Sequence, residues 1–281
     1  MTDSAASSET IDTGTELLLA RREGRLAILT FNRPEARNAL HPETYDGFAR
    51  ALPAIAEDPD IGAVMLTGAG GAFCAGGDVK GMNARNNEAT PGYTSPEART
   101  DDLRNRQRQV SATLHDFPKV VVAAIPGAAA GAGLSIALAC HLRVASTRAL
   151  LTTAFAKVGF SGDFGGSWFL THLVGAAKAR ELYLTADRVD ADRALALGLV
   201  SQVFDEANFE AEAIEYAQQF ANGPTVAYRY INENINRAAN VDLRACLDAE
   251  AVAMARTGLT EDHRAAVQSF VDKTAPTFVG R

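Results

Sequence analysis

Short apolar runs alternate with stretches of helical periodicity up to about residue 205. Residues 16–21 and 26–31 are apolar runs on either side of Glu23-Gly24, a pattern that predicts a β-hairpin. Three further runs lack polar alternation, which is typical of strands buried on both faces: 61–67, 120–125 and 142–145. Helical spacing predicts two intervening helices: 42–56 and 132–140. Because strands alternate with helices, we predict the α/β class, with parallel strands joined by crossover helices.

The C-terminal part of the chain has helical periodicity and no strand pattern. Four helices are predicted there: 208–221, 224–238, 242–256 and 260–273. The segment 1–14 is polar and rich in Ser and Thr, so we expect a disordered tail. An α/β core at 15–205 and a helical region at 206–281 would follow it. The polar, turn-rich segment 84–97 indicates a mobile loop and a candidate lid.

Composition argues against several classes of protein. The chain of 281 residues is 47% hydrophobic and 22% charged, as is usual for a globular domain. Its net charge of −7 argues against a nucleic-acid partner, which would require a basic face. We see no membrane-spanning run and no signal-peptide pattern, so we expect a cytoplasmic protein with no membrane partner. Three cysteines without paired spacing and five scattered histidines predict no metal site.

Two segments rich in small residues each follow a predicted strand and precede a helical stretch. They are 68–78 (Gly-Ala-Gly-Gly-Ala-Phe-Cys-Ala-Gly-Gly-Asp) and 126–133 (Pro-Gly-Ala-Ala-Ala-Gly-Ala-Gly). Glycine lets the backbone approach a ligand closely, and the first N–H groups of a helix have no intrahelical partner. Two such segments can each donate one N–H to the same oxygen, which is the arrangement of an oxyanion hole. The alternative is that these residues only allow tight packing of helix against sheet.

Six motifs, in matching order and spacing, resemble the crotonase (enoyl-CoA hydratase/isomerase) superfamily. They lie at 32–40 (Asn-Arg-Pro-Glu-Ala-Arg-Asn-Ala-Leu), 72–78, 123–133, 165–168 (Gly-Gly-Ser-Trp), 184–189 and 194–200. The resemblance implies a ββα spiral core and a helical C-terminal trimerisation region, in a homotrimer or a dimer of trimers. It also implies an acyl-CoA substrate, with coenzyme A as part of the substrate and no other cofactor. The pattern is most similar to the epoxyphenylacetyl-CoA isomerase branch, and fatty acid metabolism is the expected setting.

The resemblance implies roles for particular residues. It places the two oxyanion N–H donors at Gly77 and Ala132. Four cations would meet the phosphates and adenine of coenzyme A: Arg33, Arg37, Lys119 and Lys273. Three residues would line the adenine and pantetheine channel: Ala72, Ala75 and Asp78. Phe270 would line the pocket of a neighbouring subunit. For each cation, the alternative is a solvated surface charge.

Both glutamates that hydratases of this superfamily use are missing. Their positions hold Ser135 and Phe155, which stay candidate substrate-binding residues. Ser135 cannot act as a base at neutral pH without help, and Phe155 has no polar group. Asp163 lies just before a predicted helix among aromatic residues, where an apolar surround raises a carboxyl pKa and suits proton transfer. The alternative is that Asp163 only caps the helix.

The leading hypothesis is an enoyl-CoA isomerase that stabilises a thioester enolate, with Asp163 as its one base. It would move a double bond or isomerise a ring. An enoyl-CoA hydratase that uses Asp163 with water is the second hypothesis. A thioester hydrolase, or a carbon–carbon or carbon–halogen lyase, is the third, and a non-catalytic acyl-CoA binder is the fourth. Contributions from Cys74 and His41 also stay open.

Overall fold

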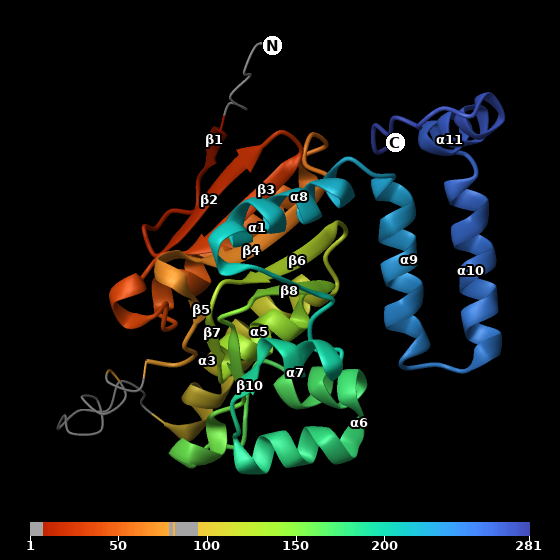
Figure 1. Cartoon of the computed structure of the whole chain (residues 1–281). Coiled ribbons are helices and arrows are strands. Elements are labelled where there is room, and N and C mark those ends of the chain that lie inside the picture. Colours follow the sequence, from red (N-terminus) through yellow and green to blue (C-terminus); the bar gives the residue numbers. More distant parts are fainter. Residues whose placement is uncertain (1–7, 79–80, 82–94) are drawn as a thin grey trace.

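Two sheets form the core of the structure (Figure 1). The computed structural model describes residues 8–78, 81 and 95–281. In spatial order, the larger sheet contains β1 (Ser8–Ile11), β2 (Leu18–Glu23), β3 (Leu26–Phe31), β4 (Ala63–Gly68), β6 (Val120–Ile125), β8 (Leu142–Ser146) and β11 (Gln202–Phe204). The smaller sheet contains, again in spatial order, β10 (Val189–Asp190), β9 (Leu150–Thr152), β7 (Ala128–Ala130) and β5 (Ala72–Cys74).

Most strand pairs are parallel. In the larger sheet, the strands from β3 to β11 pair in parallel, and β1, β2 and β3 form an antiparallel edge. In the smaller sheet, β5, β7 and β9 are parallel and β10 is antiparallel to β9. The predicted hairpin is confirmed, because Leu18 pairs with Phe31 and Glu23 pairs with Leu26. The predicted parallel α/β arrangement is confirmed as well.

Both faces of the larger sheet are buried, which explains the continuous apolar runs of its central strands. One face packs against α8 (Phe209–Ala221), which contributes a row of buried residues: Phe209, Ala213, Ala217 and Ala221. The other face packs against α1 (Pro42–Glu57) and α5 (Ala132–Ala139). Alternate side chains of β3 point to opposite faces of the sheet: Leu26 and Ile28 pack on the α8 side, and Ala27 and Leu29 pack on the other side.

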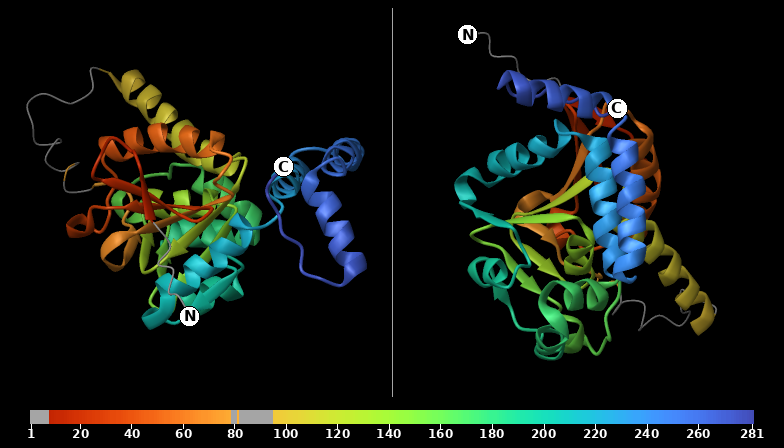
Figure 2. Two further views of the ribbon diagram at one scale, coloured as in Figure 1. Left: turned by 90° about the horizontal axis from the view of Figure 1, so that it is seen from above. Right: turned by 90° about the vertical axis from the view of Figure 1, so that its right-hand side faces the viewer.

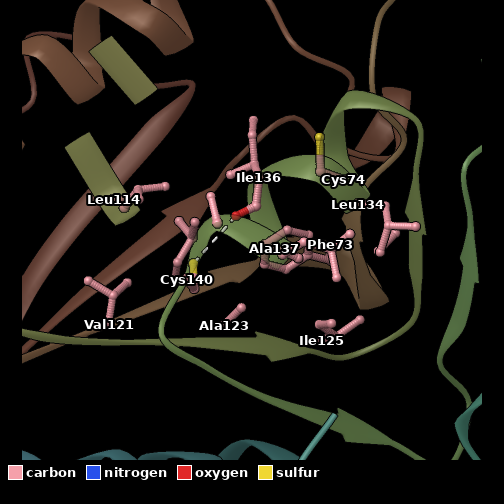
Figure 3. Close-up of a cluster of buried hydrophobic side chains, with 14 of the residues drawn as sticks. Phe73, Cys74, Leu114, Val121, Ala123, Ile125, Leu134, Ile136, Ala137 and Cys140 are labelled. Atoms are coloured by element: carbon pink, nitrogen blue, oxygen red, sulfur yellow. Dashed lines mark hydrogen bonds between the residues drawn. The ribbon is translucent and has the colours of Figure 1, made fainter. Parts of the chain in front are cut away.

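Helix α5 is buried along its whole length and packs against both sheets (Figure 3). Figure 3 shows its apolar side chains beside those of β5 and β6: Leu134, Ile136 and Ala137 with Phe73, Val121, Ala123 and Ile125. Helix α6 (Gly166–Thr185) covers α5 from outside. Because α5 has no exposed side, its first residues are held in place by packing on every side.

The remaining core helices are α3 (Pro96–Gln107), α4 (Thr113–His115) and α7 (Ala191–Ala196). Helix α3 begins where a loop was predicted: the Ser95 side chain accepts a hydrogen bond from the Ala98 N–H and caps it. The loop prediction is therefore wrong at 96–97. The rest of that predicted loop, 84–94, lies outside the described residues.

The last three helices protrude from the core, and the first of them touches it where Asn236 donates a hydrogen bond to the His115 carbonyl (Figures 1 and 2). They are α9 (Thr225–Ala238), α10 (Leu243–Thr257) and α11 (Glu261–Asp272), and α9 packs against α10. The segment after α11 turns back, where the buried Asp262 carboxylate accepts hydrogen bonds from the Val279 and Gly280 N–H groups. All four predicted C-terminal helices are present.

Two predicted boundaries need correction. The expected tail at 1–14 contains a strand, because Ser8–Ile11 pairs with β2. The boundary at 205 divides the chain one helix too early, since α8 covers the larger sheet and belongs to the core. Gly62 allows a close contact with the end of α8, because a Cβ there would lie 2.1 Å from the Ala221 carbonyl oxygen.

Candidate active site

The two glycine segments approach each other closely, backbone to backbone. Ala72 pairs with Ala128 and Cys74 with Ala129 where β5 lies parallel to β7. A Cβ on Gly76 would lie 2.6 Å from the Ala130 carbonyl oxygen and 3.1 Å from the Ala132 amide nitrogen. Glycine at 76 is therefore required by contact and by its φ of 84°. The loop that holds Gly77 thus lies directly beside the start of α5.

Backbone hydrogen bonds hold both candidate N–H donors in place. Leu40 donates its N–H to the Gly76 carbonyl at 2.8 Å, and Leu40 forms a parallel bridge with Gly77. Ala132 is the first residue of α5, so its N–H has no acceptor within that helix. Gly131 precedes it with φ 53° and ψ −127°, a conformation that favours glycine. The loop of Gly77 and the start of α5 therefore lie side by side, and the role of their N–H groups as a donor pair stays a prediction.

Asp163 holds a buried carboxylate oxygen without a partner. Its Oδ1 makes no hydrogen bond within the described part of the chain. Burial raises the pKa of this carboxyl group from 3.8 to about 6. Asp163 does not cap α6 with its side chain, because Gly165 occupies the cap position and only the Asp163 backbone carbonyl accepts from the Gly166 N–H. The capping alternative is therefore wrong.

Two stacked aromatic pairs each contain a tyrosine close enough to be affected by the charge of Asp163. The rings of Tyr45 and Phe164 stack with centroids 5.9 Å apart, and those of Phe155 and Tyr183 with centroids 6.0 Å apart. Burial, and then the nearby charge of Asp163, raise the pKa of Tyr183 to about 12. Burial also raises the pKa of Tyr45, against the opposing effect of Arg106, and the Asp163 charge adds to the rise. Both phenols therefore keep their protons at neutral pH.

Ser135 and Phe155 lie in this same group of residues. Ser135 is 2% exposed, and a Cβ on Gly166 would lie 2.2 Å from its Oγ and 2.5 Å from the Tyr183 hydroxyl. A Cβ on Gly131 would lie 3.7 Å from the Phe155 ring. The structure thus brings Phe155 to the start of α5, which holds Ala132 and Ser135, and the segment after Asp163 approaches Ser135 through Gly166.

Some of the residues predicted to bind coenzyme A lie next to the first glycine segment, and the others lie elsewhere in the structure. Arg33 lies near the first glycine segment, where its guanidinium donates to the Asp78 carboxylate at 2.9 Å. Arg37 is exposed, and its carbonyl accepts from the Ala75 N–H at 2.9 Å. Ala72 is buried in β5 beneath this loop. Arg33, Arg37 and Ala72 therefore all lie next to the loop that holds Gly77.

Lys119 and the C-terminal residues lie elsewhere. The Lys119 ammonium donates to the Ile55 and Asp58 carbonyls, at 2.6 and 2.5 Å, where α1 ends. Burial lowers the pKa of this group to about 8. Two of the three donors of this ammonium therefore serve the end of a helix, and the predicted role of Lys119 towards a phosphate stays a prediction. Phe270 and Lys273 lie on α11 and at its end, away from the core of their own chain (Figure 1).

Cys74 and His41 have structural roles in the described chain. Burial raises the pKa of the Cys74 thiol to about 12, so it is not a thiolate nucleophile at neutral pH. Its Sγ accepts a hydrogen bond from the Gly76 N–H at 3.4 Å. The His41 ring accepts a hydrogen bond from the Glu43 N–H and caps α1.

Among the described residues, no group of three or more His, Cys, Asp or Glu side chains suits a metal ion. Nor is any described helix long and apolar enough to span a bilayer.

No motif in the sequence indicated that Tyr45 and Tyr183 belong to the candidate site. Tyr45 lies in α1 and Tyr183 lies near the end of α6, each at an ordinary position of its helix. The guanidinium of Arg106, from α3, lies 4.8 Å from the Tyr45 ring centroid. These contacts join residues far apart in the sequence, so neither motif nor spacing reveals them.

The raised pKa of Asp163 predicts a pH-dependent gain in stability on substitution. Above about pH 6 the folded chain must bury a carboxylate, which the unfolded chain exposes to water. Asp163→Asn should therefore raise the free energy of unfolding by about 3 kcal/mol at about pH 8, and the gain should fall to a small fraction of that near pH 4. Urea unfolding at both pH values measures this. The exposed Asp248→Asn is the control, and an equal gain at both pH values would contradict the assignment.

Comparisons with known proteins identify the family. A family model for enoyl-CoA hydratase/isomerase matches residues 21–281. The 1,2-epoxyphenylacetyl-CoA isomerase of Escherichia coli (strain K12) is 33% identical over 95% of this chain and 99% of its own. The short-chain-enoyl-CoA hydratase of Clostridium acetobutylicum is 33% identical over 91% of this chain and 95% of its own. The crystal structure of an enoyl-CoA hydratase from Polaromonas sp. JS666 covers 93% of this chain and 99% of its own, at 35% identity and a TM-score of 0.85. The chain therefore has the crotonase-like α/β fold with C-terminal helices and belongs to the enoyl-CoA hydratase/isomerase family of enzymes.

Proposed function

We propose that this enzyme is an enoyl-CoA isomerase in which Asp163 moves a proton along the acyl chain. The thioester oxygen of the substrate would accept hydrogen bonds from the N–H groups of Gly77 and Ala132. The observation that carries the proposal is the buried carboxylate oxygen of Asp163, which has no hydrogen-bond partner among the described residues. A carboxyl group whose pKa lies near neutrality can both accept and return a proton.

The proposed reaction needs one base and no water. The Asp163 carboxylate takes a proton from a carbon conjugated to the thioester, and the C–H electron pair moves onto the thioester oxygen. The two N–H groups stabilise the negative charge of this dienolate, and one such donor is commonly worth about 3 kcal/mol of barrier. The Asp163 carboxyl then returns the proton to another carbon, and the double bond shifts with no change in mass.

The hydratase alternative fits the site less well. Its named relative from Clostridium acetobutylicum supports it by family. Addition of water requires a base for the water and an acid for the α-carbon. Ser135 and Phe155 supply neither carboxylate, so Asp163 would have to serve both steps. The 1,2-epoxyphenylacetyl-CoA isomerase relative supports the isomerase proposal instead.

A non-catalytic binder is also disfavoured. A buried ionisable group without a partner lowers stability, because its charged form loses hydration. A protein that only held coenzyme A would gain from an apolar residue at this position. The presence of a buried Asp163 near Tyr45 and Tyr183 is better explained by a proton transfer that requires it.

Substitution of Asp163 tests the proposed reaction. We expect wild-type protein to move the double bond of a 3-enoyl-CoA or a 2,5-dienoyl-CoA, and Asp163→Asn to lower kcat about 10²–10⁴-fold because the base is lost. Ultraviolet absorbance and product mass follow the reaction, and calorimetry should show an unchanged Kd for coenzyme A. Asp248→Asn is the control. A product one water heavier from crotonyl-CoA would favour the hydratase alternative and contradict the proposal.

We also propose that the protruding helices form a trimer interface. Several of their large apolar side chains are exposed in the single chain: Leu243, Leu247, Met254, Phe270 and Val271. Exposed apolar patches of this kind are typical of interaction surfaces. The trimer would also bring Phe270, which is 86% exposed, and Lys273 to the coenzyme A site of a neighbouring subunit.

The trimer proposal predicts a change of mass in solution. Light scattering should give about three or six times the chain mass of 29.7 kDa. Leu247→Glu places a charge on the exposed face of α10 and should shift the protein towards monomers. Leu184→Glu, on the 72% exposed Leu184 of α6, is the matched control and should leave the mass unchanged. A wild-type mass equal to one chain would contradict the proposal.

A further inference from the structure

The peptide group between Asp163 and Phe164 is held by a hydrogen bond at each of its two polar ends. Its N–H, on Phe164, donates to the Oε1 atom of Gln107 at 2.8 Å. Its carbonyl, on Asp163, accepts from the Gly166 N–H at 3.1 Å. A backbone N–H can only donate, so the Gln107 amide must present its oxygen to it. Gln107 lies 57 residues before Phe164 and thus links the end of α3 to the residue proposed as the base.

These two hydrogen bonds hold a strained backbone. Phe164 has a φ of 52°, in the left-handed region that residues with a side chain rarely adopt, and Gly165 follows with a φ of 75°. Rotation of the Asp163–Phe164 peptide would let Phe164 return to a negative φ, but it would break both hydrogen bonds. The buried ring of Phe164 stacks on Tyr45, so the side chain is fixed as well. The bond from Phe164 to Gln107 therefore opposes rotation of this peptide.

Gln107 is held in turn by the packing of the helix that carries it. It is the last residue of α3, and the chain continues directly into a π-helix, η3 (Arg108–Ala112). This π-helix packs against α1 and α5, with Val110 and Ser111 buried. Short π-helices within longer helices are frequently found at functional sites. The acceptor for the Phe164 N–H thus comes from an element that two other helices hold in place.

We propose that Gln107 is a positioning residue that holds the Asp163–Phe164 peptide and thereby directs the Asp163 carboxylate towards the substrate. The inference rests on the proposed function, in which Asp163 moves a proton along the acyl chain. The held peptide fixes ψ of Asp163 and φ of Phe164, and the backbone dihedral angles determine which side-chain rotamers are allowed. A displacement of about 1 Å can cost a reaction about 10²-fold in rate, so the loss of such an anchor has a measurable effect.

Gln107→Met removes the acceptor and keeps the length of the side chain. With a 3-enoyl-CoA, kcat should fall about tenfold while KM stays the same, because substrate binding does not require the anchor. The Asp163 carboxyl should also gain contact with water, which lowers its pKa. The acid limb of the pH profile of kcat/KM should therefore move below its wild-type position near pH 6.

Gln107→Glu should move the same limb in the opposite direction. Glutamate keeps an acceptor oxygen for the Phe164 N–H, so kcat should be retained at about pH 9. Its negative charge lies next to the Asp163–Phe164 peptide and should raise the pKa of Asp163, so the acid limb should move to higher pH. This variant therefore separates the hydrogen bond from the mere presence of glutamine.

A purely structural role for Gln107 makes a different prediction. If Gln107 only stabilises the fold, a folded Gln107→Met protein should keep the wild-type kcat and the wild-type acid limb. Gln109→Met, on the exposed Gln109 of the same π-helix, is the matched control and should change neither. A folded Gln107→Met protein with wild-type kcat would overturn the inference. If this variant fails to fold, an acid limb that stays in place in Gln107→Glu would overturn it instead.

Urea unfolding adds a readout that does not depend on activity. Asp163→Asn should stabilise the wild-type protein at about pH 8, because it removes a buried carboxylate. In the Gln107→Met background this gain should shrink, since the carboxylate is no longer held away from water. An undiminished gain there would overturn the inference. A wild-type protein that binds coenzyme A but moves no double bond would overturn the proposed function, and the unfolding measurements would still show whether Gln107 holds Asp163.

Discussion

The site depends on the close approach of two backbone segments. Small residues along β5 and β7 let these strands lie side by side, and the glycines that follow let the next loop touch the start of α5. A Cβ on Gly133 would lie 2.3 Å from the Cys74 carbonyl oxygen, and one on Gly127 would lie 2.1 Å from that of Gly71. No larger residue could be accommodated there without a backbone shift. The two candidate N–H donors are thus brought together by packing before any substrate arrives.

Burial then determines the chemistry that this backbone frame can support. One carboxylate oxygen of Asp163 is buried, and this exclusion of water raises the pKa of the group. The same exclusion keeps the phenols of Tyr45 and Tyr183 protonated. In the proposed mechanism, the Asp163 carboxylate has a pKa close to neutrality and accepts the proton. The N–H groups of Gly77 and Ala132 are already in place to stabilise the negative charge, so no solvent has to reorganise.

Local patterns in the sequence predicted the fold and the main features of the site. The hairpin, the buried strands and the C-terminal helices follow from the periodicity of apolar residues, and the structure confirms them. The glycine segments and the apolar setting of Asp163 were also visible in the sequence, and their catalytic roles remain proposals. The predicted tail was wrong at Ser8–Ile11 because pairing with β2 stabilises a strand that lacks apolar alternation.

Contacts between distant residues could not be predicted in this way. No pattern in the sequence indicated that the Lys119 ammonium donates to the end of α1, about sixty residues earlier in the chain. Tyr183 approaches Ser135 only because α6 packs on α5, and helical periodicity does not say which helices pack together. The division of the C-terminal helices between the core and the protruding region depends likewise on tertiary packing.

Hydrogen exchange offers the sharpest test of whether Asp163 forms a thioester dienolate. Wild-type protein would be incubated with crotonyl-CoA in D₂O, and NMR and mass spectrometry would locate deuterium. We expect deuterium at carbon 4, no addition of water, and loss of the exchange in Asp163→Asn. Exchange at an undiminished rate in Asp163→Asn, or addition of D₂O without exchange at carbon 4, would show that Asp163 does not form the dienolate.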